Sequence, residues 1–522
     1  MKTLHVHIGT PKTGTSSLQR FCVKNEETLH GLGYDYPLMP FTFPFVREFR
    51  NGHFLMGSVE AGNKKAYAES DARNLACGLE VLEEAFATYD NVVLSEESLY
   101  TRVAVNNDLR FCEVLTQHAR QHGYALHVIV YLRRPDSFAL SLHNQYVKQC
   151  SPLVSLQDVL AQTSRFDYFQ ALERIAAHVG RENITVRVYD RGIWERDGGS
   201  IYGDFLSCIG LAMSDAFFIP LRDANSSSLP GNLLAIKDAV NKLPGHTREL
   251  DEPFRRAGIR YTAHYPAEVT RFGELSAAQR RAFLAQFKES YRKVARVYLH
   301  SDEPLFSDII EDDAEPWHID NPWMASDIAE YFRRVKNRQD YLVAARDAGD
   351  EVEGDAEDAG TDAAQDAPPE EYVPAGPLSE EELEVQHAVF VEQMQAFLEY
   401  CDALTGLPEG AYERAIYYLG MFFLQRQQRI ASGQDVAPIG RVTYVCMAQA
   451  VFERCGLVME AAELGYEKLQ WRQNCMDVFE KRAYDLQKQV DAARTVGGAC
   501  RGLARSVVRV LRRVAARIVH RS

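Results

Sequence analysis

Leu4-His5-Val6-His7-Ile8-Gly9-Thr10-Pro11-Lys12-Thr13-Gly14-Thr15-Ser16-Ser17-Leu18 is the stretch that determines the fold expected for this chain. Its first five residues alternate between apolar side chains and histidines, which is the pattern of a strand. Two glycines then allow a tight loop, and a run of hydroxyl residues begins a helix. Unpaired amides and the helix dipole both favour negative charge at such a helix start. The stretch therefore predicts an anion-binding site.

The order of residues in this loop separates two classes of phosphate-binding protein. A Walker A loop has its lysine directly after the second glycine, followed by a hydroxyl residue that binds magnesium. Here Thr15 follows Gly14, and the lysine lies earlier, at Lys12. We therefore expect a loop that binds a phosphate-like group without the magnesium arrangement of an NTPase. A P-loop nucleoside kinase or NTPase is kept as the alternative.

Length and composition indicate an ordinary globular chain with room for two or three domains. The 522 residues are 46% hydrophobic and carry a net charge of −15, which argues against a general nucleic-acid-binding protein. No apolar run reaches membrane-spanning length and the N-terminal residues lack a signal-peptide pattern, so we expect a cytoplasmic protein. The ten cysteines show no zinc-like spacing, so no metal is predicted.

Strand and helix patterns alternate through the first 310 residues. Short apolar runs predict three further strands, at residues 91–95, 125–132 and 183–189. Helices are expected at residues 16–29, 64–89, 109–122 and 166–179. Strands that alternate with helices predict an α/β fold, in which a P-loop-like parallel sheet is flanked by helices.

Residues 31–57 interrupt this alternation with seven aromatic residues and three prolines. The prolines exclude a regular helix. The segment is either an ordinary covering loop or the rim of an acceptor site, because loops after the strands of α/β folds build their sites. His53 lies in this segment and is a candidate proton acceptor.

A second motif follows the most apolar of the predicted strands. That strand ends in Arg133-Arg134-Pro135, and Ser141 lies eight residues after Arg133. A guanidinium group can bind a phosphate through two parallel hydrogen bonds. Ser141, two turns into the next helix, can add a hydroxyl group from the same side.

Together these motifs resemble those of sulfotransferases that use 3′-phosphoadenosine 5′-phosphosulfate (PAPS) as donor. The order G-x-x-K-x-G-T-S resembles their 5′-phosphosulfate loop, and an arginine followed eight residues later by serine resembles their 3′-phosphate motif. The resemblance covers roughly residues 1–310 and is closest to bacterial members. It implies 5′-phosphosulfate contacts from Lys12, Thr13, Gly14, Thr15, Ser16 and Ser17, and Thr10 and Pro11 of the same loop are further binding candidates. It also implies 3′-phosphate contacts from Arg133 and Ser141.

Sulfuryl transfer requires a cation at the leaving oxygen and a base for the acceptor hydroxyl. Lys12 is the predicted cation, and no metal is required. Glu97 is the candidate base because it directly follows a strand, at the edge where α/β proteins bind ligands. A capping or ion-pairing role is the alternative for Glu97, and its neighbour Glu96 is expected to point elsewhere. The expected acceptor is a hydroxyl compound, with a glycan as the favoured class.

Beyond residue 310 the sequence predicts other kinds of structure. A helical extension is expected at residues 311–346 and an all-α domain with coiled-coil character at 379–495. Between them, residues 347–378 are acidic and contain no basic residue, which predicts a disordered linker. Residues 496–522 predict a basic amphipathic helix, which could contact an anionic membrane surface or the acidic linker. An inactive scaffold with a sulfotransferase fold is a further alternative.

Overall fold

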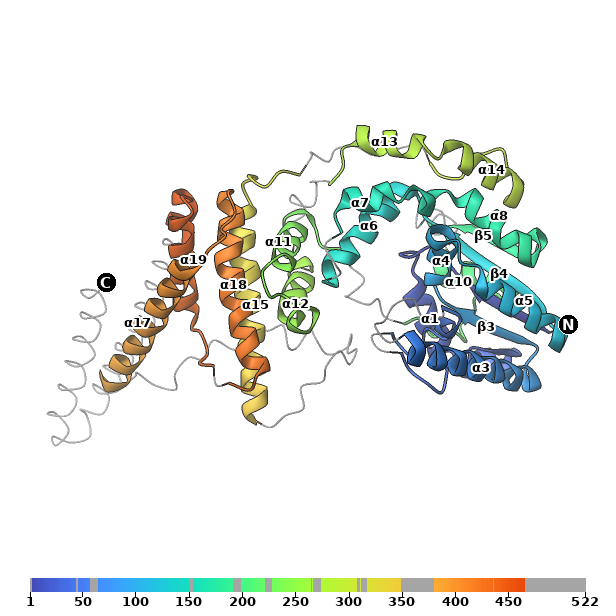
Figure 1. Cartoon of the computed structure of the whole chain (residues 1–522), viewed down its shortest axis with the longest axis horizontal. Helices are drawn as coiled ribbons and strands as arrows, with labels where there is room; N and C mark the ends of the chain where they lie inside the picture. Colours follow the sequence, from blue (N-terminus) through green and yellow to red (C-terminus); the bar gives the residue numbers. More distant parts are fainter. Residues whose placement is uncertain are drawn as a thin grey trace, which may run out of the picture. The chain divides into compact units, whose positions relative to one another are not determined.

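A computed structural model of the chain describes residues 2–43, 46–56, 64–150, 154–190, 199–220, 228–263, 265, 274–307, 310, 317–348, 380–434 and 436–464. The chain forms two compact units (Figure 1). Unit 1 comprises Met1–Gly231 and Pro266–Trp317, and unit 2 comprises Asn232–Tyr265 and His318–Ser522. Each unit is described by itself.

Unit 1 is built on a five-stranded parallel sheet with the strand order β2-β3-β1-β4-β5. The strands are β1 (Thr3–His7), β2 (Tyr34–Asp35), β3 (Asn91–Ser95), β4 (Ala125–Leu132) and β5 (Ile184–Val188). The expected α/β class is confirmed. The two-residue strand β2 lies in the proline-rich segment and was not predicted. Because all five strands are parallel, their carboxyl ends meet at one edge of the sheet.

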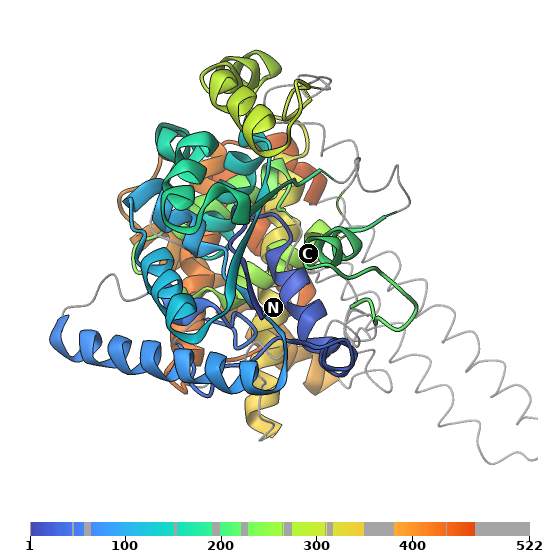
Figure 2. The same ribbon diagram turned by 90° about the vertical axis from the view of Figure 1, so that its right-hand side faces the viewer.

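Helices cover both faces of this sheet (Figure 2). The core on one face includes residues of α3 (Lys64–Thr88), α4 (Ser98–Asn106), α5 (Arg110–His122), α6 (Pro135–Lys148), α7 (Leu156–Ala161), α8 (Tyr168–Val179), α13 (Ala277–Ala285) and α14 (Lys288–Tyr298). The other face packs against α1 (Thr15–Lys24), α2 (Glu26–Gly31) and α10 (Ile201–Cys208). Leu4 and Val6 of β1 face the first layer. The alternate residue His7 makes edge contacts with the rings of Tyr131 and Phe205, which accounts for a histidine in a core strand.

The described part of unit 2 is helical. Its elements include α11 (Gly231–Asn241, of which Gly231 belongs to unit 1), α12 (Glu252–Thr262), α15 (Met324–Ala348), α17 (Glu380–Ala403), α18 (Ala411–Ala431) and α19 (Arg441–Arg454). The carboxylate of Asp327 on α15 accepts hydrogen bonds from the hydroxyls of Tyr261 and Tyr265, at 2.8 and 2.6 Å. These bonds tie α12 and the residues just after it to α15. Residues 232–265 belong to the helical unit, whereas the sequence predicts one domain through residue 310.

The helical region expected toward the C-terminus is confirmed for α17, α18 and α19. Within unit 2, α15 and α18 are joined by stacking of Phe332 on Phe423 and by an ion pair between Arg426 and Asp340. The predicted acidic linker lies outside the described residues, as do residues 465–495 of the helical domain and the basic helix at 496–522. No helix in the described ranges has the length and apolar character needed to cross a membrane.

Candidate functional site

The central strand β1 brings three loops together at the carboxyl edge of the sheet. β1 lies between β3 and β4. The Glu96 amide donates a hydrogen bond to the His7 carbonyl at 2.9 Å, and the Ile8 amide donates one to the Ile129 carbonyl at 2.9 Å. The loops that follow β1, β3 and β4 are therefore neighbours, as expected for a ligand site in a parallel α/β sheet.

The β1–α1 loop, residues 8–14, is pinned to β4. The Thr10 amide and hydroxyl both donate to the Tyr131 carbonyl, at 2.9 and 3.0 Å. The Thr13 hydroxyl in turn donates to the Thr10 carbonyl at 2.6 Å. Both threonines are fully buried, so they shape the loop with their side chains. Pro11 between them is partly exposed.

Two residues of this loop adopt left-handed backbone conformations. Lys12 has a φ of 70° and Gly14 a φ of 76°. At Gly14 a side chain is also excluded by contact, because a Cβ would lie 2.7 Å from Cδ1 of Ile201 and 3.3 Å from Cε2 of Tyr189. Gly14 is therefore required by both backbone angle and space, whereas Lys12 holds an uncommon conformation for a non-glycine residue.

Helix α1 begins directly after this loop with no side-chain cap and no acidic residue in its first turn. A helix start without a cap leaves backbone N–H groups unsatisfied and a positive dipole end. The hydroxyl of Thr15 is buried and has no hydrogen-bond partner among the described residues. Ser16 is exposed and Ser17 partly buried in the same turn. This helix start thus has donors available for an anion.

Arg133 lies directly after β4 and contacts the β1–α1 loop. Its Nη1 donates a hydrogen bond to the Lys12 carbonyl at 2.9 Å, and its guanidinium carbon lies 5.7 Å from the centre of the Tyr189 ring. Burial lowers the pKa of this guanidinium. Arg134, in contrast, pairs with the buried carboxylate of Asp136 at 2.8 Å. Ser141 is buried in the second turn of α6, and its part in phosphate binding stays a prediction.

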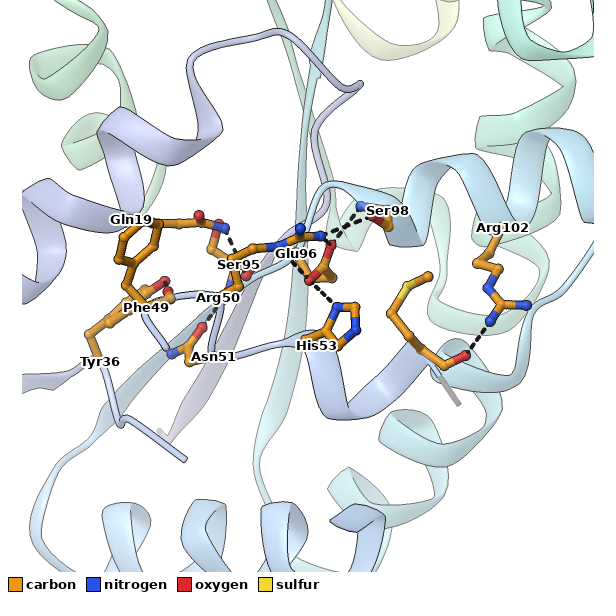
Figure 3. A network of polar contacts seen from close by, with 11 residues as sticks. Gln19, Tyr36, Phe49, Arg50, Asn51, His53, Ser95, Glu96, Ser98 and Arg102 are labelled. Carbon is orange, nitrogen blue, oxygen red and sulfur yellow. Dashed lines mark hydrogen bonds and ion pairs between the residues drawn. The ribbon is translucent and has the colours of Figure 1, made fainter. Parts of the chain in front are cut away.

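The loop after β3 contains a buried carboxylate that is held by a cation and a histidine (Figure 3). The Glu96 side chain is fully buried and forms an ion pair with Arg50. Its Oε2 lies 2.9 Å from Nδ1 of His53, and its Oε1 accepts the Ser98 amide at 2.8 Å. Burial alone would raise the pKa of Glu96, but the charge of Arg50 and the His53 contact lower it to about 2. Glu96 is therefore ionised at neutral pH.

The segment that carries Arg50 and His53 is docked along the end of β3. Asn51 donates from Nδ2 to the Val93 carbonyl at 2.9 Å and accepts the Ser95 amide at 2.8 Å. Gly52 follows, and a Cβ there would lie 2.9 Å from Cβ of Glu96. Gly52 is followed by the short 3₁₀ helix His53–Met56, whose first residue, His53, faces the Glu96 carboxylate (Figure 3). Two hydrogen bonds and a glycine thus fix the position of His53.

The structure changes the expected relation between the two adjacent glutamates. From the sequence, Glu96 is expected to point elsewhere, but in the structure it is the residue that orients His53. Glu97 lies at the N-cap position of α4, is partly exposed and makes no side-chain capping hydrogen bond there. Its assignment as the base stays a prediction. Arg50 could not be found from the sequence, because an arginine in an aromatic loop carries no pattern that points to a carboxylate 46 residues away.

A second buried polar chain links α1 to β3. Gln19 on α1 donates to the Ser95 carbonyl at 3.1 Å, and Nδ1 of His7 lies 2.9 Å from the Ser95 hydroxyl. Burial lowers the pKa of His7 to about 4, so the ring is neutral at pH 7. This chain fixes the start of α1 against the strand that precedes Glu96.

The aromatic residues of the proline-rich segment are partly core residues. Tyr36 and Phe54 are buried, and Phe41 and Phe43 pack against the core from its margin. The Phe43 ring meets the His53 ring edge-on at 4.7 Å between centres. Phe43 thereby forms one wall beside the His53–Glu96 pair.

Comparison with known proteins adds no argument about this chain. No family model and no curated protein matches the chain. A solved sulfotransferase from Alicyclobacillus acidocaldarius matches with 14% identity over 52% of this chain and 99% of its own, with a TM-score of 0.28. A likeness at that TM-score carries no argument, so the interpretation depends on the site itself.

Proposed function

We propose that this chain transfers a sulfuryl group from PAPS to a hydroxyl acceptor. The hydrogen bond from Arg133 to the Lys12 carbonyl carries the proposal, because it joins the two motifs for the two phosphates of this donor across 121 residues of sequence. The Thr15 hydroxyl, which has no partner in the described part of the chain, and the uncapped start of α1 supply further donors for the phosphosulfate group.

The proposed reaction is an in-line displacement at sulfur. The acceptor oxygen forms a bond to sulfur, and the bond between sulfur and the bridging phosphosulfate oxygen breaks. The electron pair of that bond stays on the 5′-phosphate of the leaving 3′-phosphoadenosine 5′-phosphate (PAP). Lys12 neutralises the charge that develops there, and the amides and hydroxyls at the start of α1 bind the sulfuryl oxygens. The acceptor proton passes to a base.

His53 is the base that the geometry favours. Its Nδ1 is engaged by the ionised carboxylate of Glu96, which leaves Nε2 as the nitrogen available to receive a proton. A carboxylate in this position orients the ring and fixes its tautomer. Glu96 is then a positioning residue, and Glu97 is the competing candidate for the base.

Nucleotide binding is the first test of the proposal. Isothermal titration calorimetry should show that PAP binds at least tenfold more tightly than ADP, which lacks the 3′-phosphate. Arg133→Ala should remove most of this difference. Arg134→Ala is the matched control, because that arginine pairs with Asp136, and it should leave the preference for PAP in place. Failure to bind PAP, together with magnesium-dependent ATP hydrolysis, would instead support the kinase or NTPase alternative.

Transfer of radiolabelled sulfate from PAPS to a panel of glycans tests the chemistry. A general base contributes roughly 10²- to 10⁴-fold, so His53→Gln should lower kcat by at least about 100-fold. The affinity for PAP should change little in that variant. Glu97→Gln is the matched comparison and should retain kcat within about fivefold if His53 is the base. The reverse ranking would assign the base to Glu97 and leave only orientation to His53.

A further inference from the structure

A cluster of metal-ligating side chains lies in unit 1 away from the site described above. Glu83 is near the end of α3, and His118 and His122 are in the last turns of α5. β3 and β4 begin directly after these two helices, at Asn91 and Ala125. The cluster therefore lies toward the amino edge of the sheet, whereas the β1–α1 loop lies at the carboxyl edge.

The three side chains converge on one point. Nε2 of His118 lies 3.2 Å from Oε1 of Glu83, and Nε2 of His122 lies 3.5 Å from the same oxygen. One ligand atom from each residue falls within 4.8 Å of the others. The two imidazole rings are stacked, with centres 4.1 Å apart and planes 17° apart. Residues four apart share one face of a helix, so α5 presents both rings on the same side.

We propose that Glu83, His118 and His122 bind one divalent transition-metal ion, with Zn²⁺ as the preferred ion. Two imidazole nitrogens and one carboxylate oxygen form a donor set that suits Zn²⁺. A pair of histidines at positions i and i+4 of a helix is a recurrent part of such sites. The side chains of Glu83 and His122 are 45% and 39% exposed, which leaves room for a water molecule as the fourth ligand.

The surroundings of His118 fix the nitrogen that faces the metal position. Its Nδ1 lies 2.8 Å from the Tyr124 hydroxyl, so Nε2 is the nitrogen directed at Glu83. Tyr124 is itself held by stacking on Phe86 of α3, at 4.6 Å between ring centres. Metal-binding histidines usually have such a hydrogen-bond partner on the second nitrogen. His118 is thus oriented before any ion binds.

Both helices are also held rigidly by the core. Leu82 and Phe86 of α3 and Leu115 and Ala119 of α5 belong to the same buried cluster. The three proposed ligands therefore lie on helices that are packed in the core. A bound ion would join the ends of these two helices, α3 and α5, which precede β3 and β4. The competing explanation is an ion pair between Glu83 and a protonated histidine, with no metal. The two explanations differ in one measurable property, which is stoichiometric metal binding.

The test uses the untagged full-length protein after treatment with a chelator. Titration with Zn²⁺ in a calorimeter should give one site per chain, and Co²⁺ should produce the intense visible absorption of a tetrahedral site. His122→Ala and Glu83→Gln should each weaken Zn²⁺ binding at least tenfold. Tyr124→Phe keeps the ring packing but removes the hydroxyl, and it should weaken binding roughly tenfold. Saturating Zn²⁺ should raise the Tm of unit 1 by roughly 5 °C.

Matched controls exclude adventitious binding to surface histidines and glutamates. Glu84→Gln alters the next, exposed residue of α3, and His178→Ala alters a histidine at the end of α8. Both variants should bind Zn²⁺ as the unaltered chain does. The proposal is overturned if Zn²⁺ does not bind, or if His122→Ala and Glu83→Gln bind it as tightly as the unaltered protein. PAP binding is measured on the same samples and should be independent of Zn²⁺.

Discussion

Replacing Glu96 by glutamine should make the stability of unit 1 less dependent on pH. The Glu96 carboxylate is fully buried between Arg50 and His53, and its pKa lies at about 2 instead of the ordinary 4.5. A group whose pKa is lower in the folded than in the unfolded state stabilises the fold above the unfolded pKa. That stabilisation is lost as the pH falls through the folded pKa. The relevant window therefore runs from about pH 5 down to pH 2.

The size of the effect follows from this pKa difference. A tenfold change in a proton-binding constant corresponds to about 1.4 kcal/mol, so the lowered pKa contributes about 3 kcal/mol at neutral pH. Glutamine fits the same space but carries no charge, and it leaves Arg50 without its anionic partner. Removal of one partner of a buried ion pair generally lowers the unfolding free energy by about 3–5 kcal/mol, which agrees in magnitude with the value from the pKa.

Urea unfolding followed by circular dichroism at pH 7, 5, 4 and 3 measures this contribution. The unfolding transition whose urea midpoint is shifted by Glu96→Gln at pH 7 is assigned to unit 1. The difference in unfolding free energy between the unaltered chain and the variant should be about 3 kcal/mol at pH 7 and should shrink steadily below pH 5. Other carboxylates titrate in both proteins and cancel in the comparison.

Glu97→Gln serves as the matched control, because it removes the adjacent, partly exposed carboxylate. It should change the unfolding free energy by less than about 1 kcal/mol at every pH. The reasoning is refuted if the Glu96→Gln difference is the same at pH 3 and pH 7. It is equally refuted if that variant is as stable as the unaltered chain at pH 7.

Two further predictions concern the β1–α1 loop. Lys12→Ala should lower kcat for sulfuryl transfer by roughly 10²- to 10³-fold, because it removes the charge at the leaving oxygen, while the exposed Lys24→Ala at the end of α1 should leave kcat unchanged. An effect of Lys12→Ala on KM alone would contradict that role. Gly14→Ala should lower the Tm of unit 1 and abolish PAP binding, because the new Cβ meets the Ile201 side chain at a positive φ. Gly33 also has a positive φ, but a Cβ there would meet no other atom of the described residues, so Gly33→Ala should lower the unfolding free energy by only about 1 kcal/mol. Equal effects of the two substitutions would exclude the steric explanation for Gly14.

Local patterns in the sequence predicted the sheet well. β1, β3 and β4 are continuous or alternating apolar runs, and the structure places them close to the expected bounds. Such strands can be recognised because the apolar residues that mark a buried strand lie close together in the sequence. β2 has only two residues, Tyr34 and Asp35, so no periodicity could reveal it.

The sequence could suggest single candidate residues and short motifs of the site, but not the contacts between distant residues. The β1–α1 loop could be identified because glycines, lysine and hydroxyls occur within eight residues. The contacts of Glu96 with Arg50 and His53 span 46 and 43 residues, and no local pattern encodes such pairings. The grouping of Asn232–Tyr265 with unit 2 also could not be seen in the sequence, because it involves contacts between distant residues. Tyr261 and Tyr265 bind Asp327, which lies more than sixty residues further along the chain.

The central position of β1 also affects how the protein is made. β1 precedes both of its partners along the chain, and the first of them, β3, begins at Asn91. At a synthesis rate of roughly 5–20 residues per second, the time between the synthesis of β1 and that of β3 is on the order of ten seconds. β1 has no strand to pair with in the sheet during this time. During that time the alternating residues His5 and His7 make one side of the strand polar. The histidines that become buried in the folded sheet would then limit aggregation of the nascent chain.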